Sequence, residues 1–240
     1  MKPLTRMVAV LIATISVSAL GRAPVKFHSI NIQQFCSSCF TTTVQIVVEN
    51  LAYEKQVEWI YNADNTGWAS VPAAYVKSLG DNMELWEATT NGPIAFDGIQ
   101  FAVLYSVNGQ DYWDNNGGED YYVTSSGFAL ADDVQLSLNH AAWTFVTATQ
   151  RYAFFGTVNL RNLAYEKFVT IVYTLDNWAS VQTASASYDF GNGGEYEVWR
   201  FSIDLPYGTP PQPIDFVIAY EVDGAICWDN NFGSNYHVDP

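Results

Sequence analysis

Four tryptophans of this chain share a setting in which a large ring is unexpected. Trp68, Trp113, Trp178 and Trp228 each lie in turn-like sequence close to Asn or Gly. An aromatic ring in such a loop is an awkward core residue but a good flat platform on which a ligand can stack. The alternative is that the rings anchor the loops by packing and that the Asn residues simply form turns.

These tryptophans recur because the chain contains one pattern twice. Asn50–Val71 reads NLAYEKQVEWIYNADNTGWASV and Asn162–Val181 reads NLAYEKFVTIVYTLDNWASV. Tyr105–Val123 reads YSVNGQDYWDNNGGEDYYV and Tyr220–Val238 reads YEVDGAICWDNNFGSNYHV. The offsets are 112 residues (162 − 50) and 115 residues (220 − 105). A repeat of that length has the size of a domain, so we expect two equivalent modules.

The segments around these motifs have the pattern of β-strands. Asn108-Gly109 and Asp223-Gly224 lie between apolar runs, and each is a strong signal for a two-residue hairpin. Short strands in units of this length predict two antiparallel β-sandwiches, at 24–126 and 132–240, joined by a linker at 127–131. The predicted strands, rich in β-branched and aromatic residues, are Thr43–Val48, Val57–Tyr61, Ile99–Val107, Phe168–Tyr173, Tyr196–Ile203 and Ile214–Val222.

Taken together, the motifs resemble the carbohydrate-binding modules of family 21. That family includes the starch-binding domain of fungal glucoamylases and the glycogen-binding domain of protein phosphatase 1 targeting subunits. The resemblance is carried by Asn162–Lys167, Asp176–Trp178 and Trp228–Tyr236 in the second copy. The first copy departs from it at Thr66-Gly67, Met83 and Asp120. The resemblance implies an immunoglobulin-like sandwich that binds α-1,4-glucan without cleaving it.

The resemblance also implies two sets of sugar-binding residues in each copy. Exposed aromatic rings would stack on the apolar face of glucose, and polar side chains would bond its hydroxyls. The principal set is Trp178, Trp228, Asn231, Asn235 and Lys167, with Trp68, Trp113, Asn116 and Lys55 in the first copy. The second set is Tyr165, Tyr188 and Tyr196, with Tyr53 and Tyr75 in the first copy.

Several neighbouring residues have a simpler interpretation. Trp86 and Trp199 lie inside predicted strands, and their alternation predicts core positions. Asn115 and Asn230 are expected to form turns, and Tyr105 and Tyr220 are expected to be structural. The two lysines of the principal set could instead pair with a neighbouring carboxylate.

The beginning of the chain predicts export. Lys2 and Arg6 precede an apolar run, Met7–Leu20, and small residues follow it. This is the pattern of a cleaved signal peptide at 1–23 and predicts a secreted protein. All 25 acidic but only 7 of the 10 basic residues follow Ala23, so cleavage changes the formal charge from −15 to 7 − 25 = −18. Such a field disfavours nucleic acid and anionic membranes as partners.

The three cysteines have different predicted roles. Cys36 and Cys39 are expected to form a local disulfide, because no second pair for zinc exists. Cys227, beside Trp228, is expected to be a partly buried packing residue.

Other classes of function are weaker interpretations. An enzyme would need a catalytic motif, and neither the carboxylates nor the three histidines stand in one; no cofactor or metal motif is present either. A phosphatase-targeting scaffold would need a docking segment, of which Val25-Lys26-Phe27 is a fragment lacking its basic residue. A structural or cell-wall protein with degenerate sugar sites is the remaining alternative.

Overall fold

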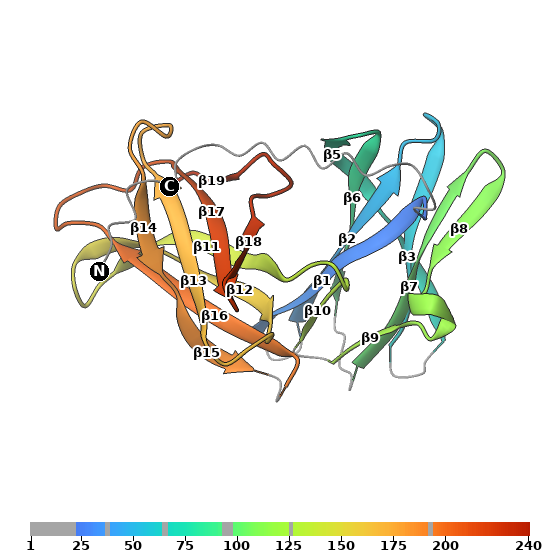
Figure 1. Cartoon of the computed structure of the whole chain (residues 1–240), viewed down its shortest axis with the longest axis horizontal. Helices are drawn as coiled ribbons and strands as arrows, with labels where there is room; N and C mark the ends of the chain where they lie inside the picture. Colours follow the sequence, from blue (N-terminus) through green and yellow to red (C-terminus); the bar gives the residue numbers. More distant parts are fainter. Residues whose placement is uncertain (1–22, 37–38, 64–66, 93–97, 125–126, 192–193) are drawn as a thin grey trace.

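The chain folds into two β-sandwiches that lie side by side (Figure 1). The computed structural model describes residues 23–36, 39–63, 67–92, 98–124, 127–191 and 194–240. Nearly the whole predicted signal segment therefore lies outside the described residues. Strands dominate, and one short 3-10 turn, η1 (Asn116–Gly118), interrupts them. The predicted tandem of antiparallel sandwiches is confirmed.

The first module consists of β1 to β10 in two sheets. Its first sheet has the order β10-β1-β2-β6-β5, and its second sheet has the order β4-β3-β7-β8, with β9 also paired to β7. The strands are β1 (Val25–Cys36), β2 (Cys39–Glu49), β3 (Lys55–Ala63), β4 (Trp68–Pro72), β5 (Ala74–Gly80), β6 (Met83–Gly92), β7 (Gly98–Val107), β8 (Gln110–Asp114), β9 (Tyr121–Thr124) and β10 (Phe128–Leu130).

The second module repeats this plan with β11 to β19. Its first sheet has the order β11-β12-β16-β15, and its second sheet has the order β14-β13-β17-β18, with β19 also paired to β17. The strands are β11 (Leu136–Val146), β12 (Arg151–Arg161), β13 (Lys167–Thr174), β14 (Gln182–Ser185), β15 (Ser187–Gly191), β16 (Tyr196–Asp204), β17 (Ile214–Val222), β18 (Ala225–Asp229) and β19 (Tyr236–Val238).

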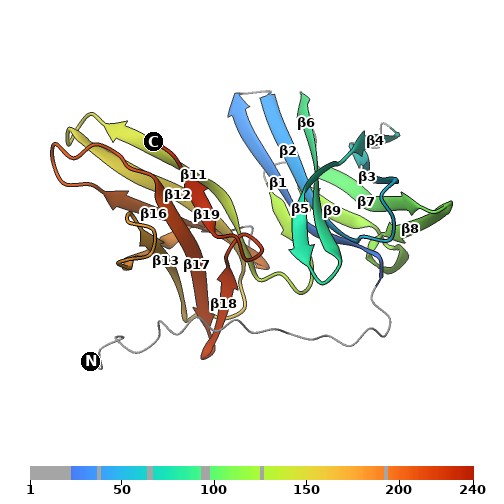
Figure 2. The same ribbon diagram turned by 90° about the horizontal axis from the view of Figure 1, so that it is seen from above.

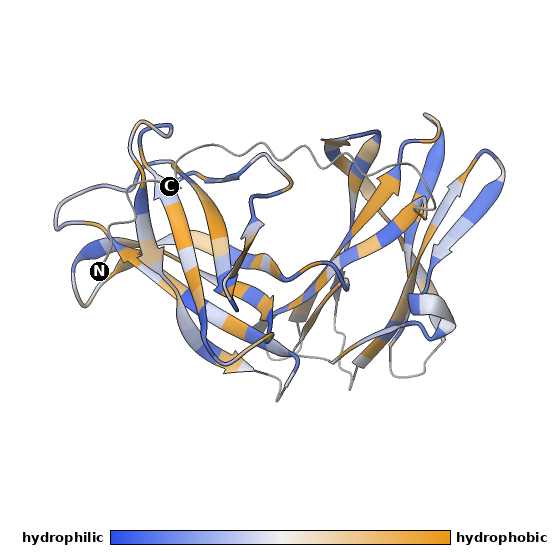
Figure 3. Cartoon of the chain, in the orientation of Figure 1, coloured by the Kyte–Doolittle hydropathy of each residue, from blue (hydrophilic) through white to orange (hydrophobic). Residues whose placement is uncertain are grey.

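Each sandwich has its own core between its two sheets, built from alternate residues of the strands (Figure 3). Trp59 and Phe101 are fully buried in the first core, and Phe154 and Phe216 in the second. Each core also contains a fully buried tyrosine that fastens one sheet to the other. The hydroxyl of Tyr105 donates to the carbonyl of Glu49 at 2.8 Å, and the hydroxyl of Tyr220 donates to the carbonyl of Arg161 at 2.8 Å. These two tyrosines are structural, as the sequence predicts.

The two predicted hairpins form with the expected backbone. Asn108 and Gly109 have φ of 53° and 73°, and Asp223 and Gly224 have φ of 50° and 75°. Both central residues of a type I′ turn need positive φ, which Asn, Asp and Gly tolerate best. The turns set the register of β7 on β8 and of β17 on β18.

The boundary between the modules lies later than the sequence suggests. Segment 127–131, predicted as a linker, contains β10, which pairs with β1 along Ser29, Ile30 and Asn31. The sequence does not reveal this strand, because the short apolar run Phe128-Ala129-Leu130 lies between polar residues at 124–126 and 132–133. The connection between the sandwiches is reduced to residues 131–135, between β10 and β11.

The two modules meet side by side (Figure 2), and side chains of both are in contact at this junction. Phe232, in the loop between β18 and β19, packs against Val47, Met83 and Leu85 of the first module. Lys77 on β5 extends its Nζ to the carbonyl oxygen of Asn231 at 2.7 Å and to the Oδ1 of Asn231 at 3.0 Å. A loop of the second module is therefore held by the first sheet of the first module.

Cys227 is a free, partly buried thiol packed against the second core, as predicted. The backbones of Cys36 and Cys39 pair across the β1–β2 hairpin, but their side chains lie outside the described part of the chain. Their predicted disulfide stays a prediction. Within the described ranges, no helix has the length and apolar character needed to cross a bilayer.

His28 lies at the junction, and its lowered pKa makes the stability of the chain depend on pH. Its ring lies 4.6 Å from that of Phe232, between centroids, and burial lowers its pKa from 6.5 to about 4, although Asp133 favours the charged form. The unfolded chain therefore binds this proton more readily, so the contribution of neutral His28 is complete above pH 6.5 and is lost as the pH falls toward 4. The loss should be about 1–3 kcal/mol.

His28→Asn should remove most of this dependence, because Asn139 occupies the equivalent position, at a β-bulge, in the second module. Urea unfolding of both proteins between pH 4 and pH 7 measures it. A variant with the same acid-dependent loss as the parent would show that His28 is not its source.

Candidate functional site

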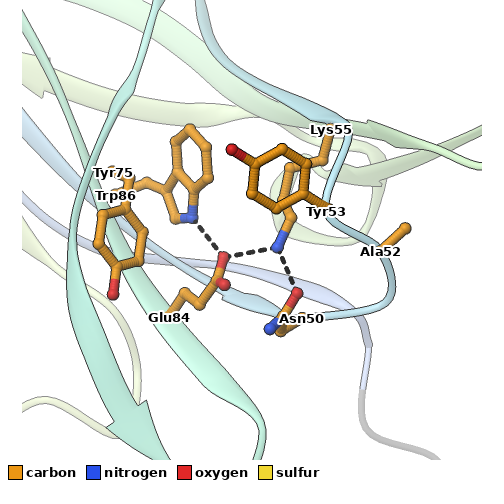
Figure 4. A pocket seen from close by; sticks show the side chains of 7 residues that line it. All are labelled: Asn50, Ala52, Tyr53, Lys55, Tyr75, Glu84 and Trp86. Carbon is orange, nitrogen blue, oxygen red and sulfur yellow. Dashed lines mark hydrogen bonds and ion pairs between the residues drawn. The ribbon is translucent and has the colours of Figure 1, made fainter.

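A polar floor with aromatic walls lies at one end of the first sandwich (Figure 4). Lys55 Nζ lies 2.6 Å from Asn50 Oδ1 and 2.7 Å from Glu84 Oε2. The indole N–H of Trp86 donates to the same Glu84 oxygen at 2.9 Å. We call this site the Lys55 pocket; it is lined by Asn50, Ala52, Tyr53, Lys55, Tyr75, Glu84 and Trp86.

The second module builds the same group of bonds. Lys167 Nζ contacts Asn162 Oδ1, and it lies 2.8 Å from Glu197 Oε1. The indole N–H of Trp199 donates to Glu197 Oε2 at 2.8 Å. We call this counterpart of the Lys55 pocket the Lys167 pocket, defined by these four residues; Tyr165 and Tyr188 stand at the positions equivalent to Tyr53 and Tyr75. Two independent copies of one buried arrangement indicate that it is a feature of the fold.

Lys55 and Lys167 each pair with a carboxylate, which the sequence offered as the alternative to sugar binding, but the pairs are buried and do not lie at the surface. The side chain of each lysine is only 4% exposed. Removing one partner of such a pair leaves the other charge buried without compensation, which is strongly destabilising, whereas a surface pair contributes little to stability. Lys55 thus lines a pocket with Tyr53 and Tyr75 of the second predicted set, and Lys167 forms the same bonds in the second module.

Trp86 and Trp199 correct another expectation. Both point inward, as their alternation predicts, and both touch their module's core. The two indoles are nevertheless only partly buried. Each donates its N–H to the glutamate of the lysine–glutamate pair instead of being enclosed by apolar side chains. The fully buried tryptophan of the first module is Trp59.

The tyrosines of the second predicted set present their rings to solvent. Tyr53 and Tyr165 are 98% and 100% exposed, and Tyr75 and Tyr188 are about half exposed. Tyr75 meets Trp86 edge-to-face with ring centroids 5.9 Å apart. Exposed rings beside a polar floor can stack on an apolar ligand face while the floor bonds its polar rim.

Tyr196 does not belong with these rings. It packs edge-to-face against Phe128 of the first module at 5.1 Å, and the Arg161 guanidinium lies 5.2 Å from its ring centroid. This packing makes Tyr196 a junction residue, and its predicted role in sugar binding stays a prediction. Met83, its counterpart in the first module, packs against Phe232 at the same junction.

The loop that presents Trp178 is held by Asp176. The Asp176 carboxylate accepts from the Ser180 hydroxyl at 2.7 Å and the Ser180 backbone N–H at 2.8 Å. Together with the Thr174 hydroxyl, these donors lower the pKa of Asp176 to about 2. Trp178 itself has φ of 66° and remains 37% exposed. A bulky residue in the left-handed region is strained, and the bonds around Asp176 are what hold it there.

The Trp-Asp-Asn-Asn motif contains an exposed tryptophan and an aspartate that forms structural hydrogen bonds. Trp228 is 54% exposed at the end of β18. Asp229 is partly buried, the loss of water around its carboxyl raises its pKa, and it accepts from the Leu138 backbone N–H and the Tyr236 hydroxyl. This aspartate joins the second sheet to β11 of the first. In the first module, Asp114 does the same for β1 and Tyr121.

The asparagines of this motif shape the loop. Asn230 Oδ1 accepts from the Gly233 N–H and Asn115 Oδ1 from the Gly118 N–H, which confirms their turn-forming role. Asn231 Nδ2 donates to the carbonyl of Asn235 at 3.0 Å, and its Oδ1 contacts Lys77. Asn116 bonds the carbonyl of Asp120 in the same way as Asn231 bonds that of Asn235. Asn116, Asn231 and Asn235 also have positive φ, so each has a structural task besides any ligand contact.

The tryptophans of one module share a sheet face but stand far apart on it. The strand register gives their positions in the first module. Trp68 on β4 is paired with Asn62 on β3. Trp113 on β8 is paired with Leu104 on β7, and Leu104 is paired in turn with Glu58 on β3. All point to the outer face of the second sheet, where Trp68 and Trp113 are both about half exposed. Trp68 and Trp113 are three strand spacings apart across the sheet and four residues apart along the strands, from Asn62 to Glu58. Their separation is therefore roughly 20 Å. A ligand that touched both would have to be a chain of several sugar units.

Both copies of this architecture match one protein family. The model of the carbohydrate/starch-binding module (family 21) matches residues 19–124 and 136–239. The chain belongs to carbohydrate-binding module family 21. Each sandwich is one such module, so the Lys55 pocket, the Lys167 pocket and the tryptophan faces are surfaces of carbohydrate-binding domains.

Curated relatives of these modules include regulatory subunits of a phosphatase. Protein phosphatase 1 regulatory subunit 3C of Bos taurus is 38% identical over 86 residues, covering 35% of this chain and 27% of that protein. Regulatory subunit 3B of Rattus norvegicus is 33% identical over 107 residues, covering 43% of this chain and 37% of that protein. The chain thus spans well under half the length of these relatives.

Solved structures similar to this chain include two of the same family. The starch-binding domain of Rhizopus oryzae glucoamylase, in complex with β-cyclodextrin and maltoheptaose, is 27% identical; the match covers 47% of this chain and 99% of that one, with a TM-score of 0.37. The carbohydrate-binding module of the muscle glycogen-targeting subunit of Protein Phosphatase-1 is also 27% identical. It covers 43% of this chain and 73% of that one, with a TM-score of 0.35.

Sequence reasoning missed three kinds of residue in these sites: Glu84 and Glu197, Asn50 and Asn162, and the inward tryptophans Trp86 and Trp199. A signal for them exists. Glu84-x-Trp86 and Glu197-x-Trp199 put a carboxylate and an indole on the same strand face, and Asn50 and Asn162 stand five residues before the lysines. An acidic residue on an inward face needs a partner, and the repeated lysine is the available cation.

The buried pair gives a stability prediction. Glu84→Ala leaves Lys55 buried without its carboxylate, so the free energy of unfolding of the first module should fall by about 2–5 kcal/mol. Glu221→Ala, which removes an exposed strand glutamate, should change it by less than about 0.5 kcal/mol. Chemical denaturation of the full chain measures both. Equal, small effects would show that the Lys55 pair contributes no more than a surface pair.

Proposed function

We propose that this protein binds α-1,4-glucan outside the cell, without cleaving it, and that both modules bind at once. The observation that carries the proposal is the double occurrence of one lysine–glutamate–indole group, with a fully exposed tyrosine two residues before each lysine. Family membership supports carbohydrate as the ligand. A glucose ring has an apolar C–H face, which suits the tyrosine, and a rim of hydroxyls, which suits the polar floor.

The acid–base features of the pockets favour binding over catalysis. A glycosidase places two carboxyl groups on either side of the scissile bond. Among the described residues lining the Lys55 pocket, Glu84 is the single carboxylate, and it is held by Lys55 and Trp86. The described lining of the pocket therefore does not offer the pair of carboxyl groups that glycoside hydrolysis uses. Export is supported by the pattern at 1–23, with its basic start and apolar run.

A phosphatase-targeting role is the second candidate, because the curated relatives include phosphatase regulatory subunits. The fragment Val25-Lys26-Phe27 is poorly placed for docking such a partner. It lies in β1, where Val25 and Phe27 are buried in the first core. Co-precipitation of the folded chain with the phosphatase catalytic subunit tests this role, and retention that survives an excess of soluble starch would favour it.

The proposed function predicts retention on starch without release of sugar. The purified chain should be depleted from solution by granular starch and released by maltoheptaose. A reducing-end assay on soluble starch should give no product that tracks the protein. Steady release that disappears when a carboxylate of the chain is mutated would overturn the non-catalytic proposal; failure to bind starch, glycogen or maltoheptaose would overturn the ligand.

The tandem predicts avidity on long polymers. A single shallow sugar site should be weak, whereas a second site on the same chain can add roughly 10²–10⁴ in apparent affinity when both can engage. Replacing the exposed rings of one module, by Tyr53→Ala, Trp68→Ala and Trp113→Ala, should therefore weaken binding to amylose by a factor in that range. The matched variant of the second module is Tyr165→Ala, Trp178→Ala and Trp228→Ala.

On maltotriose, which is too short to bridge the modules, each variant should lose only its own module's sites. Because all six rings are exposed, both variants should keep the parent's unfolding temperature. Isothermal titration with both ligands decides the point. An equal loss on maltotriose and amylose would mean that the two modules bind independently.

A further inference from the structure

A separate pocket lies at the junction, away from the Lys55 pocket and the tryptophan faces. Its walls come from the end of β1 and the start of β10 in the first module, and from β11, β12, β15 and β16 in the second. Amide side chains dominate its lining: Asn31, Gln33, Gln34, Asn139 and Asn159. None of the described residues that line it is Asp, Glu, Lys or Arg, although the chain has a formal charge of −15.

A β-bulge places one of these amides between the modules. The register of β11 on β12 shifts between Leu138 and His140, so Asn139 is the extra residue. Bulges re-aim a side chain. Here Asn139 Oδ1 accepts from Asn31 Nδ2 at 2.5 Å and from Gln33 Nε2 at 3.0 Å. Amides of both modules are thereby fixed side by side in the wall of the pocket.

The second observation is a buried acceptor without a partner. Asn159 is 1% exposed, and its Oδ1 has no hydrogen-bond partner within the described chain. Leaving such a group unsatisfied costs roughly 1–3 kcal/mol. The sandwich does not require an amide here. The equivalent position of the first module, 112 residues earlier, is the buried Val47, and it pairs with Leu85 as Asn159 pairs with Val198.

An aromatic ring borders the same pocket. Phe190 on β15 is 52% exposed and follows a register shift after Tyr188. Its counterpart in the first module, also after such a shift, is Lys77, which holds the loop of Phe232. The pocket thus combines five amide side chains with the exposed rings of Phe190 and His140. Sugar hydroxyls both donate and accept, as amides do, and the Phe190 ring can stack on their C–H face.

We propose that the junction pocket is a third kind of sugar-binding site, which takes one or two units of a neutral glucan chain and exists only because two modules meet. The proposal rests on the proposed function, since it assumes a glucan ligand. In the bound state a sugar hydroxyl donates to Asn159 Oδ1. The site would add binding to the tandem chain that neither the Lys55 nor the Lys167 pocket supplies.

Nuclear magnetic resonance of the full chain titrated with maltotriose tests it. The side-chain amide signals of Asn31, Gln33 and Asn139 report on the junction, and the indole signals of Trp178 and Trp228 report on the second module's tryptophan face. We expect both groups to shift, with separate saturation curves. Indole shifts without amide shifts would overturn the junction site and leave the proposed function standing; no shift in either group would overturn both.

Asn159→Val supplies the mutational test, because Val47 shows that the fold accepts valine there. The variant should keep or raise the unfolding temperature, since it removes an unpaired acceptor, while maltotriose binding at the amide signals weakens about 5–100-fold. Phe190→Ala should weaken the same binding, whereas Tyr207→Ala, which removes an exposed ring elsewhere, should not. A lower unfolding temperature with unchanged amide titration would show that Asn159 is a structural residue and overturn the proposal.

Discussion

The functional surface of each module depends on one buried ion pair, between Lys55 and Glu84 and again between Lys167 and Glu197. Removing two charges from water is costly, and apolar residues could fill the same volume with equal stability. The pair persists because it does what apolar residues cannot: it binds the asparagine that starts the tyrosine loop and the indole that walls the pocket. The exposed Tyr53 and Tyr165 are thus carried by loops whose base is fixed by charge.

At the junction, the outer face of the first sheet has a different role in each module, because it carries different residues. The first sheet of the first module presents Val47, Met83 and Lys77, which hold Phe232 and its loop. The equivalent face of the second module presents Asn159 and Phe190, which border a polar pocket instead, and Tyr196, which packs against Phe128 of the first module. The two modules thus share one backbone arrangement at this face but differ in the side chains at its equivalent positions. The contact also brings the first module against the Trp-Asp-Asn-Asn loop of the second, whose Asn231 it bonds directly.

The repeat and the alternation of the strands sufficed to predict two β-sandwiches and both type I′ hairpins, because these depend on local residue types. The exposure of Trp68, Trp113, Trp178 and Trp228 was predictable for the same reason. The buried pairs of the lysines were not predictable, since their partners Glu84 and Glu197 lie about thirty residues away and become neighbours only when the sandwich closes. The strand within segment 127–131 and the packing of Tyr196 on Phe128 were not predictable either, because a pattern within one repeat does not reveal contacts between the modules or with β10.

The most direct test is a crystal structure of the full chain with maltoheptaose. Our account predicts sugar density against Tyr53 and Tyr75 above the Lys55–Glu84 pair, and against Tyr165 and Tyr188 in the second module, with the tryptophan faces also occupied. In that complex the lysine–glutamate bonds should remain intact. Sugar bound with both tyrosine pairs empty, or with Lys55 drawn away from Glu84, would contradict the claim that the buried pair is the fixed base of the binding surface.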